Sequence, residues 1–170
     1  PFLPITDEVD YMEISRPDGP PPGVIEGVFN RYRNAVHFTD SVAGDVVDLI
    51  DELGLAEDTL VFVTGDHGEE FLENGFFGHT STFSPLQVRV PFLVRGPGIK
   101  AGREGRPTQH QDFPATLLEL LGADPALRRD WVLGENLLQP LEERRRVLSG
   151  WNEMGLWTPS GILRLSLDDQ

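Results

Sequence analysis

The sequence contains no cysteine. This absence excludes disulfide bonds, thiolate zinc sites and a cysteine nucleophile within the chain. The sequence also has no apolar run approaching the roughly 18 to 20 residues that a bilayer-spanning helix needs, and no basic-then-apolar leader. We therefore expect contact with a membrane only through segments that these 170 residues do not include.

Positive charge is scarce. The chain has 14 Lys and Arg residues against 28 Asp and Glu residues, a formal net charge of −14. Such a surface repels phosphate backbones and anionic membranes, so nucleic acid is not an expected partner. Carboxylates also attract divalent cations, but charge alone does not distinguish a metal site from a solvated acidic surface.

The length of 170 residues fits one domain of ordinary size. Residues 1–25 carry the proline-rich text "RPDGPPPG", so we expect an extended arm there, and residues 26–170 should form the folded part. The chain begins with Pro1 rather than Met, which suggests that it is a piece of a longer protein.

The periodicity of the apolar residues predicts an α/β fold. From Glu26 to Leu53 they recur at steps of three and four, which predicts a long amphipathic helix. Two apolar strands should follow, at 60–66 and 87–98, and then a helix at 110–122. We expect a mostly parallel sheet flanked by helices.

The C-terminal end predicts a small antiparallel addition to this sheet. "RVLSGW" and "GILRLSL" have the pattern of two short strands, with "TPSG" as a turn between them or just before the second. The arginines at 144–146 are expected on a solvated surface near the start of a strand. Asp112 is expected near the start of the 110–122 helix, where the helix dipole favours a carboxylate.

The segment "FVTGDHGEEFLENGFFGHTS", residues 62–81, carries the candidate chemistry. Asp66 and His67 leave the end of the first strand, the place where open α/β sheets collect ligands. Flanking glycines allow the backbone to bend, so that the carboxylate and the imidazole can converge on one cation. Zinc or manganese suits the imidazole, whereas magnesium or calcium fits if the remaining ligands are oxygens.

His79 is the second candidate in this segment. It could be a third metal donor, or it could donate a hydrogen bond to an anionic oxygen of a substrate. The acidic residues between the histidines could orient His67, with Glu69 the best placed, or could form a solvated turn. The ordinary alternative for Asp-His-Gly alone is a turn or helix cap without a ligand.

Three motifs occur in order along the chain: "DTLVFVTGDHGEEFLENGFFGHTS", "RVPFLVRGPGI" and "HQDFPATLLELLG". Together they resemble the C-terminal part of the catalytic domain of the sulfatase family, within the alkaline-phosphatase superfamily. The resemblance covers roughly residues 26–125, with a weaker likeness to the membrane-anchored, envelope-associated branch. It implies that Asp66 and His67 ligate the active-site divalent metal. It also implies that His79 is catalytic, contacting the sulfate or phosphate oxygens or supporting the leaving group.

The family's nucleophile motif, Cys/Ser-x-Pro-x-Arg, does not occur in this chain, nor is the Thr or Ser of the transferase branches matched. In the family these groups and further acidic metal ligands belong to an N-terminal half. The resemblance therefore implies a C-terminal fragment of a metal-dependent hydrolase acting on sulfate esters, which is inactive alone. Phosphate ester hydrolysis or phosphoethanolamine transfer is the alternative within the superfamily.

A different class also remains open: a non-catalytic module of sulfatase fold that binds lipid or a protein partner. The resemblance implies an extracytoplasmic compartment, periplasmic or on a membrane-anchored parent. If a half of the sheet is missing, the apolar face left bare should drive self-association of the fragment, which light scattering can test.

Overall fold

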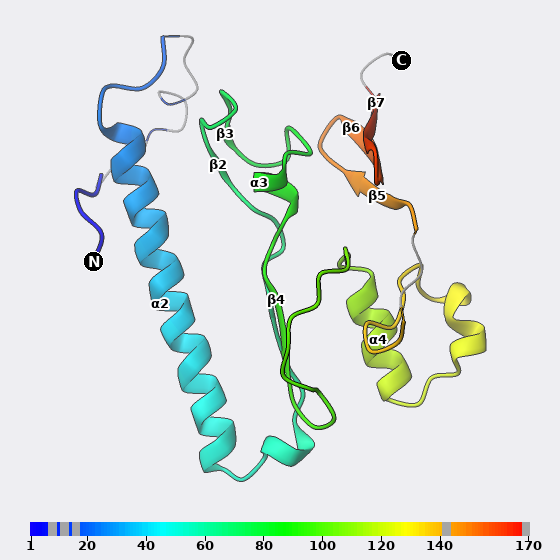
Figure 1. Ribbon diagram of the computed structural model, residues 1–170. Coiled ribbons are helices and arrows are strands. Elements are labelled where there is room, and N and C mark those ends of the chain that lie inside the picture. Colours follow the sequence, from blue (N-terminus) through cyan, green and yellow to red (C-terminus); the bar gives the residue numbers. More distant parts are fainter. Residues whose placement is uncertain (7–9, 11–13, 15–17, 141–143, 168–170) are drawn as a thin grey trace. The chain divides into compact units, whose positions relative to one another are not determined.

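The computed structural model describes residues 1–6, 10, 14, 18–140 and 144–167 (Figure 1). The remaining residues, which include much of the expected proline-rich arm, lie outside the described part. Two compact units divide the chain, Pro1–Lys100 and Ala101–Gln170.

The first unit is dominated by one long helix, α2, Val24–Glu52 (Figure 1). It begins two residues before the predicted Glu26 and ends just before Gly54, whose N–H donates to the Asp51 carbonyl. The prediction of this helix from apolar periodicity is confirmed. In the part of the chain that the structure describes, no helix combines the length and apolar character that crossing a membrane requires.

The apolar stripe of α2 is covered only near its N-terminal end. There the rings of Phe29 and Tyr32 pack against Phe71, with ring centroids 5.0 and 5.1 Å apart. Further along the helix the stripe is open, and Val46 and Leu49 keep about half of their surface exposed. The expected self-association through such a face stays a prediction.

Strands β1, Val61–Thr64, and β4, Phe92–Arg95, form a two-stranded antiparallel sheet in which Val61 lies opposite Arg95. All strand pairs in the described residues are antiparallel, so these residues do not show the parallel direction that was expected. A parallel pair requires a crossover connection, usually a helix that carries the chain back along the sheet. The segment between these strands contains a short hairpin and a four-residue helix instead, and β4 runs opposite to β1.

The segment that connects β1 to β4 contains a short hairpin next to the candidate residues Asp66, His67 and His79. It contains β2, Glu70–Phe71, paired antiparallel with β3, Phe77–Gly78, and then the short helix α3, Pro85–Val88. A single turn of 3₁₀ helix, η1, Ala56–Asp58, precedes β1.

The second unit begins with α4, Asp112–Leu120, and the 3₁₀ helix η2, Pro125–Asp130. Its sheet is an antiparallel meander of β5, Arg146–Ser149, β6, Glu153–Thr158, and β7, Gly161–Ser166. The antiparallel C-terminal addition is therefore confirmed, with one strand more than predicted. The predicted turn "TPSG" joins β6 to β7 and is closed by a hydrogen bond from Thr158 Oγ1 to the Gly161 carbonyl.

Asp112 is the polar centre of this unit and is fully buried. Its carboxylate accepts from the backbone N–H of Gln109 and of Glu135, each at 2.9 Å, and forms an ion pair with Arg144. The start of α4 is thus tied to two segments that follow it in sequence.

The prediction that the arginines at 144–146 lie on a solvated surface is wrong for two of them. The Arg144 side chain is only 16% exposed, because it pairs with buried Asp112. Arg146 is 7% exposed, donates to the Pro107 carbonyl and packs over the Trp157 ring at 5.0 Å. Contacts within the second unit therefore hold both guanidinium groups away from solvent.

Candidate functional site

The loop after β1 lies against α3 through its backbone. The N–H of Gly68 donates to the Gln87 carbonyl at 2.8 Å. A Cβ at position 68 would lie 1.8 Å from the Leu86 carbonyl oxygen, so only glycine fits this close approach. Gly68 therefore allows Asp66 and His67 to turn out of the strand.

Asp66 and His67 bring one oxygen and one nitrogen donor together. Asp66 Oδ2 lies 3.6 Å from His67 Nε2, and the two side chains are 89% and 42% exposed. His67 Nδ1 lies 2.9 Å from the Gly68 carbonyl. Because a carbonyl can only accept, Nδ1 carries the proton in the neutral ring and Nε2 keeps its lone pair on the side near Asp66.

The Asp66 carboxyl is favoured in its ionised form. The backbone N–H of His67 donates to Asp66 Oδ1 at 3.0 Å. The pKa of Asp66 is lowered chiefly by this hydrogen bond. The backbone N–H of Asp66 itself and the nearby His67 imidazole lower it further. An ionised carboxylate beside a free imidazole lone pair is the form that a divalent cation binds.

The donor pair fits a divalent metal. Two ligands on a tetrahedral zinc, each about 2.1 Å from the metal, lie about 3.4 Å apart, close to the 3.6 Å between Asp66 Oδ2 and His67 Nε2. Within the described ranges, no group of three or more His, Asp or Glu residues could hold a metal. A metal held by this pair would need further ligands.

His79 lies directly against this pair. Its ring stacks on the His67 ring, with centroids 3.8 Å apart and planes 25° apart. Its Nδ1 lies 3.1 and 3.2 Å from the two carboxylate oxygens of Glu69. The structure thus brings Asp66, His67 and His79 into one cluster. Glu69 contacts His79 in it, whereas the sequence suggested His67 as its partner.

For Glu70, one of the acidic residues between the histidines, the expectation of a solvated turn is wrong. Glu70 is fully buried and accepts hydrogen bonds from Ser84 Oγ, Asn74 Nδ2 at 2.7 Å and Gln87 Nε2 at 3.0 Å. Burial raises the pKa of the Glu70 carboxyl, but these hydrogen bonds lower it more, so its pKa lies below the ordinary value. Neighbouring residues on a strand point to opposite faces. The adjacent pair Glu69 and Glu70 was therefore a sequence signal that one of the two side chains points inward.

We expect Glu70→Gln to weaken the chain at neutral pH and to flatten its acid sensitivity. The depressed pKa means that Glu70 stabilises the fold fully above its unfolded pKa near 4.5, and that this stability is lost as pH falls through the lower folded pKa. Loss of the charged acceptor should cost about 1–3 kcal/mol at pH 7. Urea unfolding across the acidic range measures both effects.

Glu73→Gln is the matched control for this prediction, since it removes the same charge from an exposed position of the same hairpin. It should leave the pH dependence almost as in the wild type. If the Glu70→Gln and wild-type stability curves run parallel from neutral to acid pH, the assignment of Glu70 is wrong.

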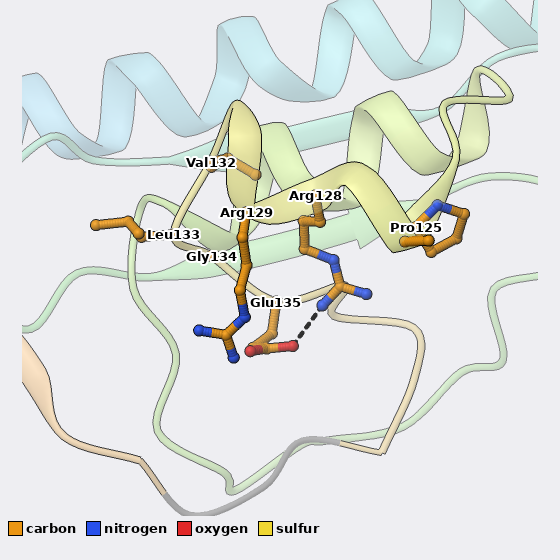
Figure 2. A pocket seen from close by; sticks show the side chains of 8 residues that line it. Pro125, Arg128, Arg129, Val132, Leu133, Gly134 and Glu135 are labelled. Carbon is orange, nitrogen blue, oxygen red and sulfur yellow. Dashed lines mark hydrogen bonds and ion pairs between the residues drawn. The ribbon is translucent and has the colours of Figure 1, made fainter.

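A separate pocket lies in the second unit, between η2 and the residues that follow it (Figure 2). Its volume is about 220 Å³. Arg128, one of its lining residues, already pairs with Glu119 and Glu135. We assign no chemistry to this pocket, because that guanidinium is neutralised within the fold.

Comparison with known proteins identifies relatives for most of the chain. The family model described as "Sulfatase" matches residues 6–123, more than half of the chain. An arylsulfatase of Chlamydomonas reinhardtii is 36% identical over 93 residues, which is 52% of this chain and 14% of that protein. A steryl-sulfatase of Rattus norvegicus is 36% identical over 131 residues, 68% of this chain and 22% of that protein.

A choline-sulfatase of Rhizobium meliloti (strain 1021) is 30% identical over 107 residues, 63% of this chain and 21% of that protein. Among solved structures, a protein in the alkaline phosphatase superfamily from Vibrio parahaemolyticus matches with a TM-score of 0.61 and 26% identity. That match covers 81% of this chain and 32% of the other. The chain thus spans between about a seventh and a third of the length of these proteins.

These matches confirm the resemblance seen in the motifs and the expected α/β, alkaline-phosphatase-like fold class. The matched residues contain the whole stretch from α2 through the Asp66, His67 and His79 cluster to α4. The chain belongs to the sulfatase family.

Proposed function

We propose that this chain is the C-terminal part of the catalytic domain of a metal-dependent sulfatase that hydrolyses sulfate esters. The observation that carries the proposal is the pairing of Asp66 Oδ2 with His67 Nε2 at 3.6 Å, with the Nε2 lone pair left free. In this arrangement residues 1–25 serve as an arm and residues 26–170 as the folded part of that domain. The parent protein acts outside the cytoplasm.

Asp66 and His67 would hold the divalent ion: zinc or manganese suits the imidazole, and calcium or magnesium fits if the remaining ligands are oxygens. A bound divalent ion polarises ester oxygens and lowers the pKa of a nucleophile. The nucleophile and the remaining acidic ligands belong to polypeptide outside this sequence. The chain alone is therefore inactive.

His79 contributes the substrate contact. Its Nδ1 edge is occupied by Glu69, so Nε2 is the ring nitrogen available to an oxygen of the transferred group or of the leaving group. A nitrogen placed there balances charge that develops on the ester as its bond to the leaving group breaks.

Transfer or hydrolysis of phosphate esters, including phosphoethanolamine transfer, is the alternative chemistry for the same residues. A non-catalytic module that binds lipid or a protein is the alternative of a different class. In such a module Asp66 and His67 would be retained ligands without turnover. Assays of the longer protein with sulfate and phosphate esters distinguish sulfate ester hydrolysis, phosphate ester chemistry and a non-catalytic module.

We expect Asp66→Asn and His67→Gln to reduce hydrolysis of an aryl sulfate by the longer protein roughly 100- to 1,000-fold, because metal polarisation contributes several kcal/mol. Rates with an aryl sulfate and an aryl phosphate, before and after chelation, measure the effect. The exposed carboxylate of Glu57, in η1, provides the matched control Glu57→Gln, which should keep full activity.

Calorimetry on the 170-residue chain tests the incomplete site directly. Binding of zinc, manganese, calcium or magnesium should be weak, since two donors do not complete a site. Tight stoichiometric binding that disappears in Asp66→Ala would contradict the proposal that the other ligands come from outside this chain. Faster turnover of the aryl phosphate than of the aryl sulfate would favour the phosphate alternative.

A further inference from the structure

The contact between Glu69 and His79 defines the orientation of the second histidine. Both carboxylate oxygens of Glu69 lie within hydrogen-bond distance of His79 Nδ1, at 3.2 and 3.1 Å. The Glu69 side chain is only 26% exposed, so the contact is partly shielded from water. Because a carboxylate only accepts, Nδ1 must carry the proton.

The hairpin geometry places these two residues opposite each other. In the β2–β3 pair Glu70 lies opposite Gly78, and extending that register by one residue brings Glu69 opposite His79. The side chain of Glu70 then points to the other, buried face, where it holds Ser84 and Gln87. One face of the hairpin is therefore structural and the other carries the Glu69–His79 pair.

The backbone around His79 is held in an uncommon conformation. Gly78 has φ 110° and Thr80 has φ 72°, so His79 is flanked by two residues in the left-handed region. For a β-branched residue such as threonine this conformation costs on the order of 1–3 kcal/mol, and it persists only when the surrounding structure requires it. Such strain is concentrated at sites where a side chain must be aimed.

Two contacts together restrain the His79 ring. The stack on His67, at 3.8 Å, restrains the plane of the ring, and the hydrogen bond to Glu69 determines which edge faces inward. Without an acceptor at Nδ1 the ring could rotate by 180° or change its tautomer, and Nε2 would no longer be presented reproducibly. A carboxylate is the strongest neutral-pH acceptor for this purpose.

We infer that Glu69 is a positioning residue: it holds His79 in the Nδ1–H form and thereby presents Nε2 to an oxygen of the ester. This inference rests on the proposed function for the role of Nε2. The hydrogen-bonding role of Glu69 itself can be measured in the chain without metal, nucleophile or substrate.

Ring ¹H–¹⁵N correlation NMR of the 170-residue chain, at a pH that keeps imidazoles neutral, tests the tautomer. His79 signals are identified among the four histidines by their loss in His79→Gln. We expect the proton of His79 on Nδ1 in the wild type. Glu69→Gln keeps an oxygen acceptor and should retain the Nδ1–H form, whereas Glu69→Ala should change it toward the Nε2–H form. Glu73→Gln removes an equal charge from the same hairpin, keeps an oxygen acceptor for the Phe71 N–H, and should leave the His79 signals unchanged.

The longer protein supplies the second readout. Glu69→Ala should lower kcat about 10- to 100-fold with little change in KM, and Glu69→Gln should recover part of the loss. Nε2–H in the wild type, or no change of tautomer in Glu69→Ala, overturns the inference. The expected ring signals in a protein that hydrolyses no ester would support the positioning role and contradict the proposed function.

Discussion

Asp112→Ala is expected to destabilise the second unit by about 3–5 kcal/mol, because it removes the buried carboxylate that Arg144 contacts and leaves this mostly buried guanidinium only the more distant Glu135 carboxylate, at 3.9 Å. The backbone N–H groups of Gln109 and Glu135 lose their acceptor at the same time. A loss of this size is a large fraction of the stability of an ordinary domain. Urea unfolding followed by tryptophan fluorescence measures it, since all three tryptophans lie beyond residue 100.

Two variants make this result specific. Asp130→Ala removes a carboxylate from an exposed position at the end of η2 and should change stability by no more than about 0.5 kcal/mol. Adding Arg144→Met to Asp112→Ala should recover part of the loss, because the buried cation that has lost its nearer carboxylate is then gone. A shift of less than about 1 kcal/mol for Asp112→Ala would show that the ion pair does not organise this unit.

Gly68→Ala is expected to displace the Asp66–His67 loop and to remove activity from the longer protein. The new Cβ would lie 1.8 Å from the Leu86 carbonyl oxygen, a backbone atom that cannot rotate away. Relief requires the loop and α3 to separate, which breaks the hydrogen bond from Gly68 N–H to Gln87. We expect a cost of about 3 kcal/mol, at the upper end for overpacking, and a loss of activity of about 100-fold from misplacement near 1 Å.

Gly44→Ala is the matched control, because it makes the same substitution at a position of α2 with no atom within 4 Å of the new Cβ. It should stabilise the helix by about 0.5–1 kcal/mol, as alanine loses less backbone entropy on folding than glycine. Urea unfolding and the aryl sulfate assay are applied to both variants. Normal stability and turnover in Gly68→Ala would mean that the loop does not pack on α3 as described.

The helices, which depend on patterns of neighbouring residues, were predicted well from the sequence. The three- and four-residue spacing of apolar side chains, together with Gly54, predicted α2 to within two residues at its start. "HQDFPATLLELLG" likewise predicted α4. A helix of this kind depends on contacts among residues close in sequence, so its pattern can be read directly.

Strand direction and the burial of charge could not be obtained in this way. The apolar runs of β1 and β4 predict strands but contain no information about direction, which depends on the connection between them. Arg144 reads as a solvated cation until its partner Asp112, 32 residues earlier, is placed beside it. Glu70 reads as one of several acidic residues, and only the packing of Ser84 and Gln87 shows that it is buried.

The sequence by itself determined the long helix, the strand that ends at the Asp66–His67 pair and membership of the sulfatase family, because each depends on short, ordered patterns of residue type. Only the tertiary structure decided that Glu69 meets His79, that β4 runs against β1 and that Asp112 holds Arg144. These are contacts between segments separated along the chain, and the free energy of such a contact depends on what else is buried with it.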